Sequence, residues 1–566
     1  MRFSKLLTYH LLLLSLAGVG CSDVFDVADS SSGADDGENS VYLRLILNNN
    51  KTTSTRAADD AVYGNPYGGE DGDGREPAVP REYRIYDLNI FIYSLAGGNA
   101  LNYVYPETVS IKKQLYVDGI SNEGLINEDE DGKIDVIFDD IIRVTGYEPG
   151  PNDYVLVMAN LGKPVDDTYN IAALQHMSFD STWQGDVTNE ISHFTMATAR
   201  TGTGLSAYEG KIDTKDTNGD KVDPFKVETT IERTAARIDF WHDAENESLD
   251  GDVVESFKYD VFDSLTESDT GADVVITHIV PVNVMVPGSY AFKHVTGSFA
   301  DMSIKICGDE THESGMPTNY VLAPLTKDKQ GKTLEYMFGN SRLATAKTAI
   351  KDADENSPYR VKSLLGNSNF GFTGGEEFGK YHILCYANEN THIGKNFDTN
   401  YLTGLAFKAL YVPSVVYSGA DDDGKLIMDE SWSKGKDFWR FAPAHDGSGS
   451  GKDVGESYCK YFSSLEAANA YKAANPEMNG IITNYPGGVC YYNLWIKHAN
   501  YASDNNPDPQ EMFEMQYGIV RNNIYRVGVS FSGPGDSEPT MNGPVNMRPK
   551  IFVRKWNLRD EKEIIF

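Results

Sequence analysis

The side chains best suited to metal chemistry are acidic residues in three glycine-containing clusters. In the first, oxygen-bearing residues precede and follow a glycine, as they do in a calcium loop. Its candidate ligands are Asn127, Asp129, Asp131 and Asp135. The twelfth position of that pattern is Phe138, where a calcium loop needs a bidentate glutamate, so the motif is incomplete. Residues 216–223 and 421–424 hold similar fragments, and among 83 acidic residues ordinary turns are the favoured interpretation of all three.

Motifs that would carry catalysis are missing from the sequence. The 11 histidines show no HExxH spacing, Gly202 and Gly204 lack the third glycine of a dinucleotide site, and no GxSxG elbow occurs. We therefore expect no enzymatic activity and no cofactor. An extracellular hydrolase stays open as an alternative only because a pair of carboxylates that meet in space leaves no sequence pattern.

Composition and charge narrow the class of protein. A chain of 566 residues is expected to form two or more domains, and 33 tyrosines with 52 glycines favour strands and turns over helical bundles. The formal net charge of −33 argues against nucleic acid as a partner, because phosphate contacts need clustered Lys and Arg.

The N-terminus has the form of an export signal. Arg2 and Lys5 precede an apolar stretch, Leu6–Val19, which is short for a permanent membrane span. Small residues before Cys21 and polar residues after it resemble a bacterial lipoprotein cleavage site, although Gly18 stands where leucine is commoner. We predict lipidation at Cys21, with an ordinary secretory signal as the alternative. Pairing among the other cysteines, which are widely spaced, stays open. These are Cys307, Cys385, Cys459 and Cys490.

The segment Val41–Arg56 combines an apolar strand with a polar tether and a single arginine. One face of the expected strand carries Val41, Leu43, Leu45 and Leu47. Two interpretations follow from these residues alone. The strand is either the ordinary first strand of a β-domain or a detachable piece whose removal would leave an unfilled groove.

Many further short runs with alternating apolar residues are separated by Gly, Asn, Asp and Pro. This pattern is typical of β-sandwich domains. One helix is expected at Ser464–Ala474, which is rich in helix formers and followed by Asn475-Pro476. We therefore predict an all-β fold with a minor helix.

Two motifs carry a family resemblance. VRNNIYRV at Val520–Val527 is followed by a Gly/Pro loop, by IFVRKW at Ile551–Trp556 and by an apolar end, Ile564–Phe566. This order resembles the C-terminal region of the Bacteroidales-type fimbrillins, the type V pilin family, in particular the major subunit of the minor fimbria. VETTIERTAARI at Val227–Ile238 resembles the VERxxAR strand of the same family.

The resemblance implies a fold and a mechanism. Members have two transthyretin-like β-sandwich domains in series and are exported as lipoproteins to the outer membrane before they form a cell-surface fimbria. An Arg-specific protease would cut between Arg56 and Ala57, which would release the first strand. C-terminal strands of a neighbouring copy would then fill the groove, so that the chain polymerises by strand exchange and supports adhesion. The donor-strand candidates are Ile551, Phe552, Val553, Trp556, Ile564, Ile565 and Phe566.

The resemblance also implies a domain plan and partners. The expected divisions are a signal peptide at 1–20, a lipidated propeptide at 21–56, an N-terminal sandwich at 57–290, and a C-terminal sandwich at 291–566 with donor strands at 547–566. Expected partners are copies of the same chain, accessory, tip and anchor subunits, the protease, and a host or bacterial surface receptor. An accessory or tip subunit is one alternative, and a monomeric, surface-anchored glycan-binding lipoprotein is the other.

Overall fold

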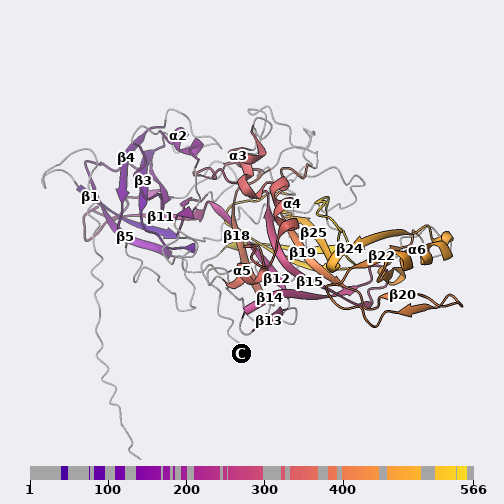
Figure 1. Cartoon of the computed structure of the whole chain (residues 1–566). Coiled ribbons are helices and arrows are strands. Elements are labelled where there is room, and N and C mark those ends of the chain that lie inside the picture. Colours follow the sequence, from indigo (N-terminus) through magenta and orange to yellow (C-terminus); the bar gives the residue numbers. More distant parts are fainter. Residues whose placement is uncertain are drawn as a thin grey trace, which may run out of the picture.

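The structure is a computed structural model of the whole chain. The residues that it describes are 40–48, 75–76, 82–95, 109–120, 136–166, 170–178, 183–184, 193–199, 210–242, 247–250, 253–292, 294–296, 320–325, 332–366, 380–391, 398–444, 455–498, 517–543 and 545–556. Figure 1 shows two large groups of strands, with the early strands on one side and the later strands on the other.

The N-terminal group is one eight-stranded sheet that folds over a single core. One layer contains β5 (Val136–Thr145), β1 (Ser40–Asn48), β11 (Phe225–Arg233) and β10 (Ile212–Asp213). The other contains β4 (Ile111–Val117), β3 (Leu88–Ser94), β6 (Asp153–Ala159) and β9 (Met196–Thr198). The strand β11 joins the layers, because its first part pairs with β1 and its last part with β9. Leucine, isoleucine and valine side chains from both layers form the core between them.

The C-terminal group is a second sandwich. One layer contains β18 (Lys380–Asn388), β12 (Ala235–His242), β26 (Asn523–Phe531), β27 (Met547–Trp556) and β2 (Arg75–Glu76). The other contains β13 (Glu247–Asp250), β14 (Val253–Phe262), β15 (Asp269–Val282), β19 (Gly404–Val412) and β25 (Val489–Trp495). Among the described residues, a single bridge from Val261 to Phe531 joins the layers, and one large apolar core fills the space between them.

Smaller elements surround the two sandwiches. A five-stranded sheet projects from the C-terminal sandwich, with α6 beside it (Figure 1). Its strands are β21 (Leu426–Met428), β20 (Tyr417–Ala420), β23 (Lys460–Phe462), β22 (Phe438–Ala442) and β24 (Ile481–Tyr485). Two-stranded pieces are β7 (Trp183–Gln184) with β8 (His193–Phe194), and β16 (His294–Thr296) with β17 (Tyr320–Leu322). The helices are α2 (Ile171–His176), α3 (Leu334–Phe338), α4 (Leu343–Asp352), α5 (Val361–Gly366) and α6 (Leu465–Ala474), and the short 3-10 turns are η6 (Gly339–Ser341), η8 (Glu456–Tyr458), η9 (Pro476–Met478) and η10 (Pro486–Gly488).

The prediction of an all-β chain with sandwich domains and a minor helix is confirmed. The expected helix is α6, and Ser464 caps it by accepting a hydrogen bond from the Ala467 amide at 3.1 Å. The five-stranded sheet was not expected. Its strands are three to five residues long, too short for alternation to reveal them.

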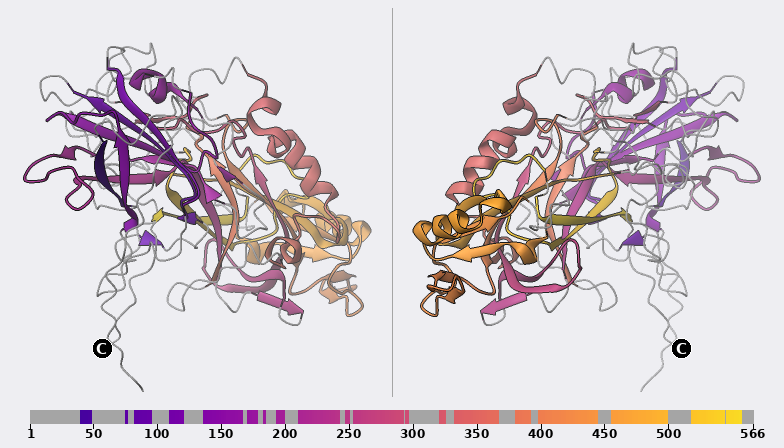
Figure 2. Two further views of the ribbon diagram at one scale, coloured as in Figure 1. Left: turned by 90° about the vertical axis from the view of Figure 1, so that its left-hand side faces the viewer. Right: turned by 90° about the vertical axis from the view of Figure 1, so that its right-hand side faces the viewer.

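The two sandwiches meet at Thr234. Figure 2 shows the two sandwiches from two further sides. The strand β11 ends at Arg233 and β12 begins at Ala235, so one residue links the two sheets. This change of sheet comes well before the boundary after residue 290 that the sequence analysis proposed. No linker composition marks it, because the two strands are nearly continuous.

Candidate functional site

The strand β1 lies inside its sheet, between β5 and β11 (Figure 1). Nine of its residues pair with β5 in antiparallel register, and six pair with β11 in parallel register. The first described strand is therefore paired along both edges. Its removal would leave β5 and β11 with unpaired backbone groups facing each other across one strand's width.

The apolar face of β1 supplies part of the N-terminal core. Leu43, Leu45 and Leu47 are 3%, 2% and 0% exposed, and all three belong to the main core of that sandwich. Val41 is partly buried against the same core. Burial of a leucine side chain contributes about 1.5–3 kcal/mol. The three leucines together therefore hold the strand in place by several kcal/mol.

The other face of β1 is fixed by polar contacts. Arg44 forms two hydrogen bonds to Asp139 on β5, at 2.8 and 2.7 Å, and these bonds raise the pKa of Arg44. The Asn48 amide donates to Glu228 on β11 at 3.0 Å. Polar groups on both neighbouring strands thus fix the register of β1.

The loop at residues 216–223 holds the beginning of β1. The Tyr42 amide donates to the Gly219 carbonyl at 2.9 Å. Gly219 has a φ of +71°, and a Cβ there would lie 2.2 Å from the ring of Phe225. The carboxylates of Asp220 and Asp223 accept hydrogen bonds from backbone amides of the loop. This acidic cluster therefore serves as a turn, as the favoured interpretation of the sequence had it.

The C-terminal strand β27 lies in the second sandwich of its own chain. It pairs with β26 along nine residues in antiparallel register, and its end pairs with the short strand β2. Ile551 is 1% exposed and packs in the C-terminal core together with Met547. The side chains of Phe552, Val553 and Trp556, and the whole of residues 557–566, lie outside the described residues.

The two sequence motifs meet their partners where the sandwiches join. From the VETTIERTAARI motif, Arg233 donates to the Glu82 carbonyl, and Arg237 lies 3.1 Å from the Glu82 carboxylate. Arg237 also contacts Asp239 at 2.9 Å. Burial lowers the pKa of Arg233 to about 10, although Glu82 opposes it. Burial also disfavours the charge on Arg237, but Asp239 and Glu82 outweigh it and raise the pKa of Arg237.

A third buried arginine, Arg521, comes from the VRNNIYRV motif. Arg521 contacts Glu389 through two hydrogen bonds of 2.9 and 2.7 Å, and neither side chain is exposed. It also donates to the backbone carbonyls of Tyr290 and Ala291, and Ala291 packs against residues of the N-terminal sandwich. The motif arginines are therefore structural groups that fix the join. Their partners Glu82 and Glu389 were missed, because no spacing links them to the motifs.

Several predicted site residues lie outside the described residues. These are Cys21, Arg56, Ala57, Asn127, Asp129, Asp131, Asp135, Ile564, Ile565 and Phe566. The structure therefore shows β1 in its groove and Ile551 in the C-terminal core. The processing site and the first acidic cluster lie outside the described residues. Cys385, Cys459 and Cys490 are free thiols. None of the helices in the described part of the chain is long and apolar enough to span a membrane.

Residues 483–562 match the C-terminal model of the fimbrillins, described as the major fimbrial subunit protein type IV. The match contains β25, β26 and β27, together with the VRNNIYRV and IFVRKW motifs. This C-terminal region is therefore similar to the C-terminal domain of the fimbrillins. The family resemblance read from those motifs is thereby confirmed.

Solved fimbrial proteins are also similar to the chain. The fimbrilin FimA of Porphyromonas gingivalis W83 is 13% identical, with a TM-score of 0.33 over 92% of this chain and 99% of that one. The tip fimbrial protein Mfa3 of P. gingivalis, with a C-terminal truncation, is 9% identical, with a TM-score of 0.32 over 92% and 100%. Comparison with curated proteins finds no match.

The fimbrillin match supports a coarse function. It indicates a structural subunit of a cell-surface fimbria rather than an enzyme. It also implies assembly with other fimbrial subunits.

Proposed function

We propose that this fimbrial subunit polymerises by protease-activated strand exchange, with β1 as the strand that is removed. The observation that carries the proposal is the position of β1, which is paired on both edges and supplies three core leucines. An N-terminal strand at the edge of its sheet would leave a solvated edge on removal. Removal of β1 instead opens a groove with two unpaired edges and an apolar floor.

The groove sets requirements for the strand that replaces β1. The incoming strand must run antiparallel to β5 and parallel to β11, as β1 does. It must also present apolar side chains at alternate positions, in place of Leu43, Leu45 and Leu47. Main-chain hydrogen bonds then complete the sheet while the alternate side chains fill the core, which is the physical basis of strand addition.

Cleavage after Arg56 would cut the chain eight residues beyond the end of β1 at Asn48. The cut leaves the strand held by its hydrogen bonds and its buried leucines. Departure of β1 therefore needs a competing strand or a slow opening of the sheet. Cleavage would also separate the mature subunit, which begins at Ala57, from the lipid on Cys21.

The proposed donor lies at the end of the chain. Ile551 packs in the core of its own C-terminal sandwich. Insertion of Ile551 into a neighbouring copy would therefore require β27 to separate from β26. The apolar residues Ile564, Ile565 and Phe566 follow β27 and are our preferred donors. The other donor-strand candidates, nearer the C-terminal sandwich, are Phe552, Val553 and Trp556.

Arg56→Ala tests the activation step. We expect this variant to accumulate as a full-length lipidated monomer without polymer, because β1 stays covalently attached and the groove stays filled. Polymer is detected as ladders on gels after mild heating. Lys51→Ala, a basic residue of the same tether, is the matched control and should give normal ladders. Ladders that persist in Arg56→Ala would contradict the proposal, and a monomer that binds glycans while anchored through Cys21 would favour the binding lipoprotein.

A further inference from the structure

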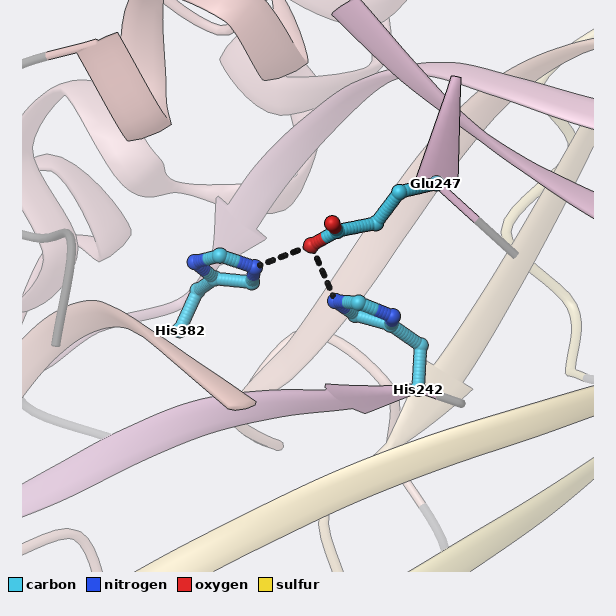
Figure 3. Close-up of side chains that lie close together, drawn as sticks. All are labelled: His242, Glu247 and His382. Atoms are coloured by element: carbon cyan, nitrogen blue, oxygen red, sulfur yellow. Dashed lines mark hydrogen bonds and ion pairs between the residues drawn. The ribbon is translucent and has the colours of Figure 1, made fainter. Parts of the chain in front are cut away.

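Three side chains converge at one end of the C-terminal sandwich. Figure 3 shows His242, at the end of β12, and His382, on β18, both directed at the carboxylate of Glu247, at the start of β13. The Nε2 atom of His242 lies 3.4 Å from Oε1 of Glu247, and Nε2 of His382 lies 3.3 Å from the same oxygen. One nitrogen from each ring and one carboxylate oxygen thus surround a common point.

The sheet itself fixes the two histidines. In the antiparallel pairing of β12 with β18, His382 lies opposite Phe240, two residues before His242. The histidines are therefore diagonal neighbours on one face of the sheet. Their rings are stacked with centroids 5.1 Å apart and an angle of 12° between the planes. Two imidazoles held this way can bind one metal ion without a change in the backbone.

The site is enclosed. The side chains of His242, His382 and Glu247 are 0%, 4% and 4% exposed. The ring of Phe257 covers both histidines, with centroids 4.5 Å from His242 and 5.8 Å from His382. A bulky substrate has no access to such a place, so the arrangement suits a structural group rather than a catalytic one.

The spacing of the donor atoms fits a tetrahedral ion. Two ligands at about 2.0–2.2 Å from a tetrahedral zinc ion lie roughly 3.3–3.5 Å apart. The two His–Glu separations have this value, and they are longer than the 2.7–3.2 Å of ordinary N–H···O hydrogen bonds. All three donor atoms lie within 4.8 Å of one another.

We propose that His242, Glu247 and His382 bind a structural Zn²⁺ ion. Two imidazole nitrogens with one carboxylate oxygen suit zinc, whereas calcium and magnesium prefer oxygen ligands alone. The described residues supply three protein ligands, and one water molecule buried together with the ion would complete the tetrahedron. No sequence pattern predicts the site, because Glu247 follows His242 by 5 residues and His382 follows Glu247 by 135 residues.

The ion would clamp the two layers of the C-terminal sandwich together. His242 and His382 belong to the layer of β12 and β18, and Glu247 belongs to the opposite layer through its pairing with β14. The strand β18 ends the order of its sheet, so the ion would also fix an edge strand. Because an ion that binds only the folded state stabilises it by mass action, loss of zinc should destabilise this sandwich. Strand exchange in the N-terminal sandwich does not depend on it.

The full chain, purified without a polyhistidine tag, tests the site. After incubation with Zn²⁺ and removal of free metal, we expect one zinc ion per chain by elemental analysis and a higher melting temperature than in chelator. Substitution with Co²⁺ should give the visible absorption of tetrahedral cobalt. Glu247→Gln and His382→Gln should each weaken Zn²⁺ binding at least about a hundredfold, since even residues that only orient the ligands cost 10–100-fold.

The control is His278→Gln, which removes another buried histidine, 6% exposed, whose Nε2 atom lies 2.8 Å from the Asp354 carbonyl oxygen. It should bind one zinc ion as tightly as the natural chain. Circular dichroism of Glu247→Gln in chelator should match that of the natural chain in chelator, which separates loss of metal from loss of fold. A natural chain that retains no zinc, or zinc binding that both cluster variants preserve, would overturn the proposal.

Discussion

Substitution of Leu45 should change the stability of the unprocessed chain but not that of the assembled subunit. Leu45 is 2% exposed in the N-terminal core and belongs to the strand proposed to leave. Leu45→Ala should destabilise the N-terminal sandwich of the unprocessed chain by about 2–5 kcal/mol, as measured by urea unfolding. Subunits recovered from fimbriae should unfold as the natural ones do, because they no longer contain residue 45.

The matched control for that experiment is Leu115→Ala, which alters the same core from β4. This variant should be destabilised both before and after processing. A loss of stability from Leu45→Ala that persists in subunits from fimbriae would mean that β1 stays in the sheet.

The buried pair of Arg521 and Glu389 tests the structural role of the VRNNIYRV motif. Arg521→Met leaves the Glu389 carboxylate buried without its cation, which should cost about 3–5 kcal/mol in the free energy of unfolding. The double variant with Glu389→Gln should recover part of that loss. Two losses that simply add in the double variant would show that the pair is not coupled.

Residue patterns predicted part of the site and could not predict the rest. The alternation of Val41, Leu43, Leu45 and Leu47 predicted a strand with one buried face, and the structure has it. The motif arginines were recognised, but the role of Arg237 depends on Glu82, which is 155 residues away in the sequence. Contacts of this kind follow from topology rather than from local pattern, and the same reason hid the His242 cluster.

At the scale of elements, the sequence predicted many of the segments with a strong local signal, and it did not predict the short or unmarked ones. The strand β1 and the helix α6 have strong local signals, alternation in one and helix formers with a capping serine in the other. The helix α4 was missed, although Leu343, Ala346 and Ile350 are spaced as one face of a helix and are buried. The change of sheet at Thr234 was missed because a single residue separates β11 from β12.

Truncation at two positions tests the donor element. A chain that ends at Trp556 keeps β27, so it should fold and melt close to the full chain. Without residues 557–566 it should be processed and cap the growing polymer, and gels after mild heating should show no long ladders. A chain that ends at Asn546 also loses Met547 and Ile551 from the core, so it should be strongly destabilised. Normal ladders from the chain that ends at Trp556 would show that residues 557–566 are not the donor and would leave β27 as the donor strand.

At the scale of the whole molecule, the two sandwiches have separate tasks in this account. The N-terminal sandwich holds the replaceable strand, and the C-terminal sandwich carries the end of the chain toward a neighbouring copy. The buried arginines at the join connect the two sandwiches through Glu82 and the Ala291 carbonyl. The fimbrillin match covers only part of the C-terminal sandwich, whereas the proposed acceptor groove lies in the N-terminal one.

The most direct test of strand removal is the N-terminal sequence of subunits isolated from fimbriae shed into the medium. The account predicts a single start at Ala57, with β1 absent from the polymerised chain. A mature subunit that begins at a lipidated Cys21 and still contains residues 40–48 would contradict it.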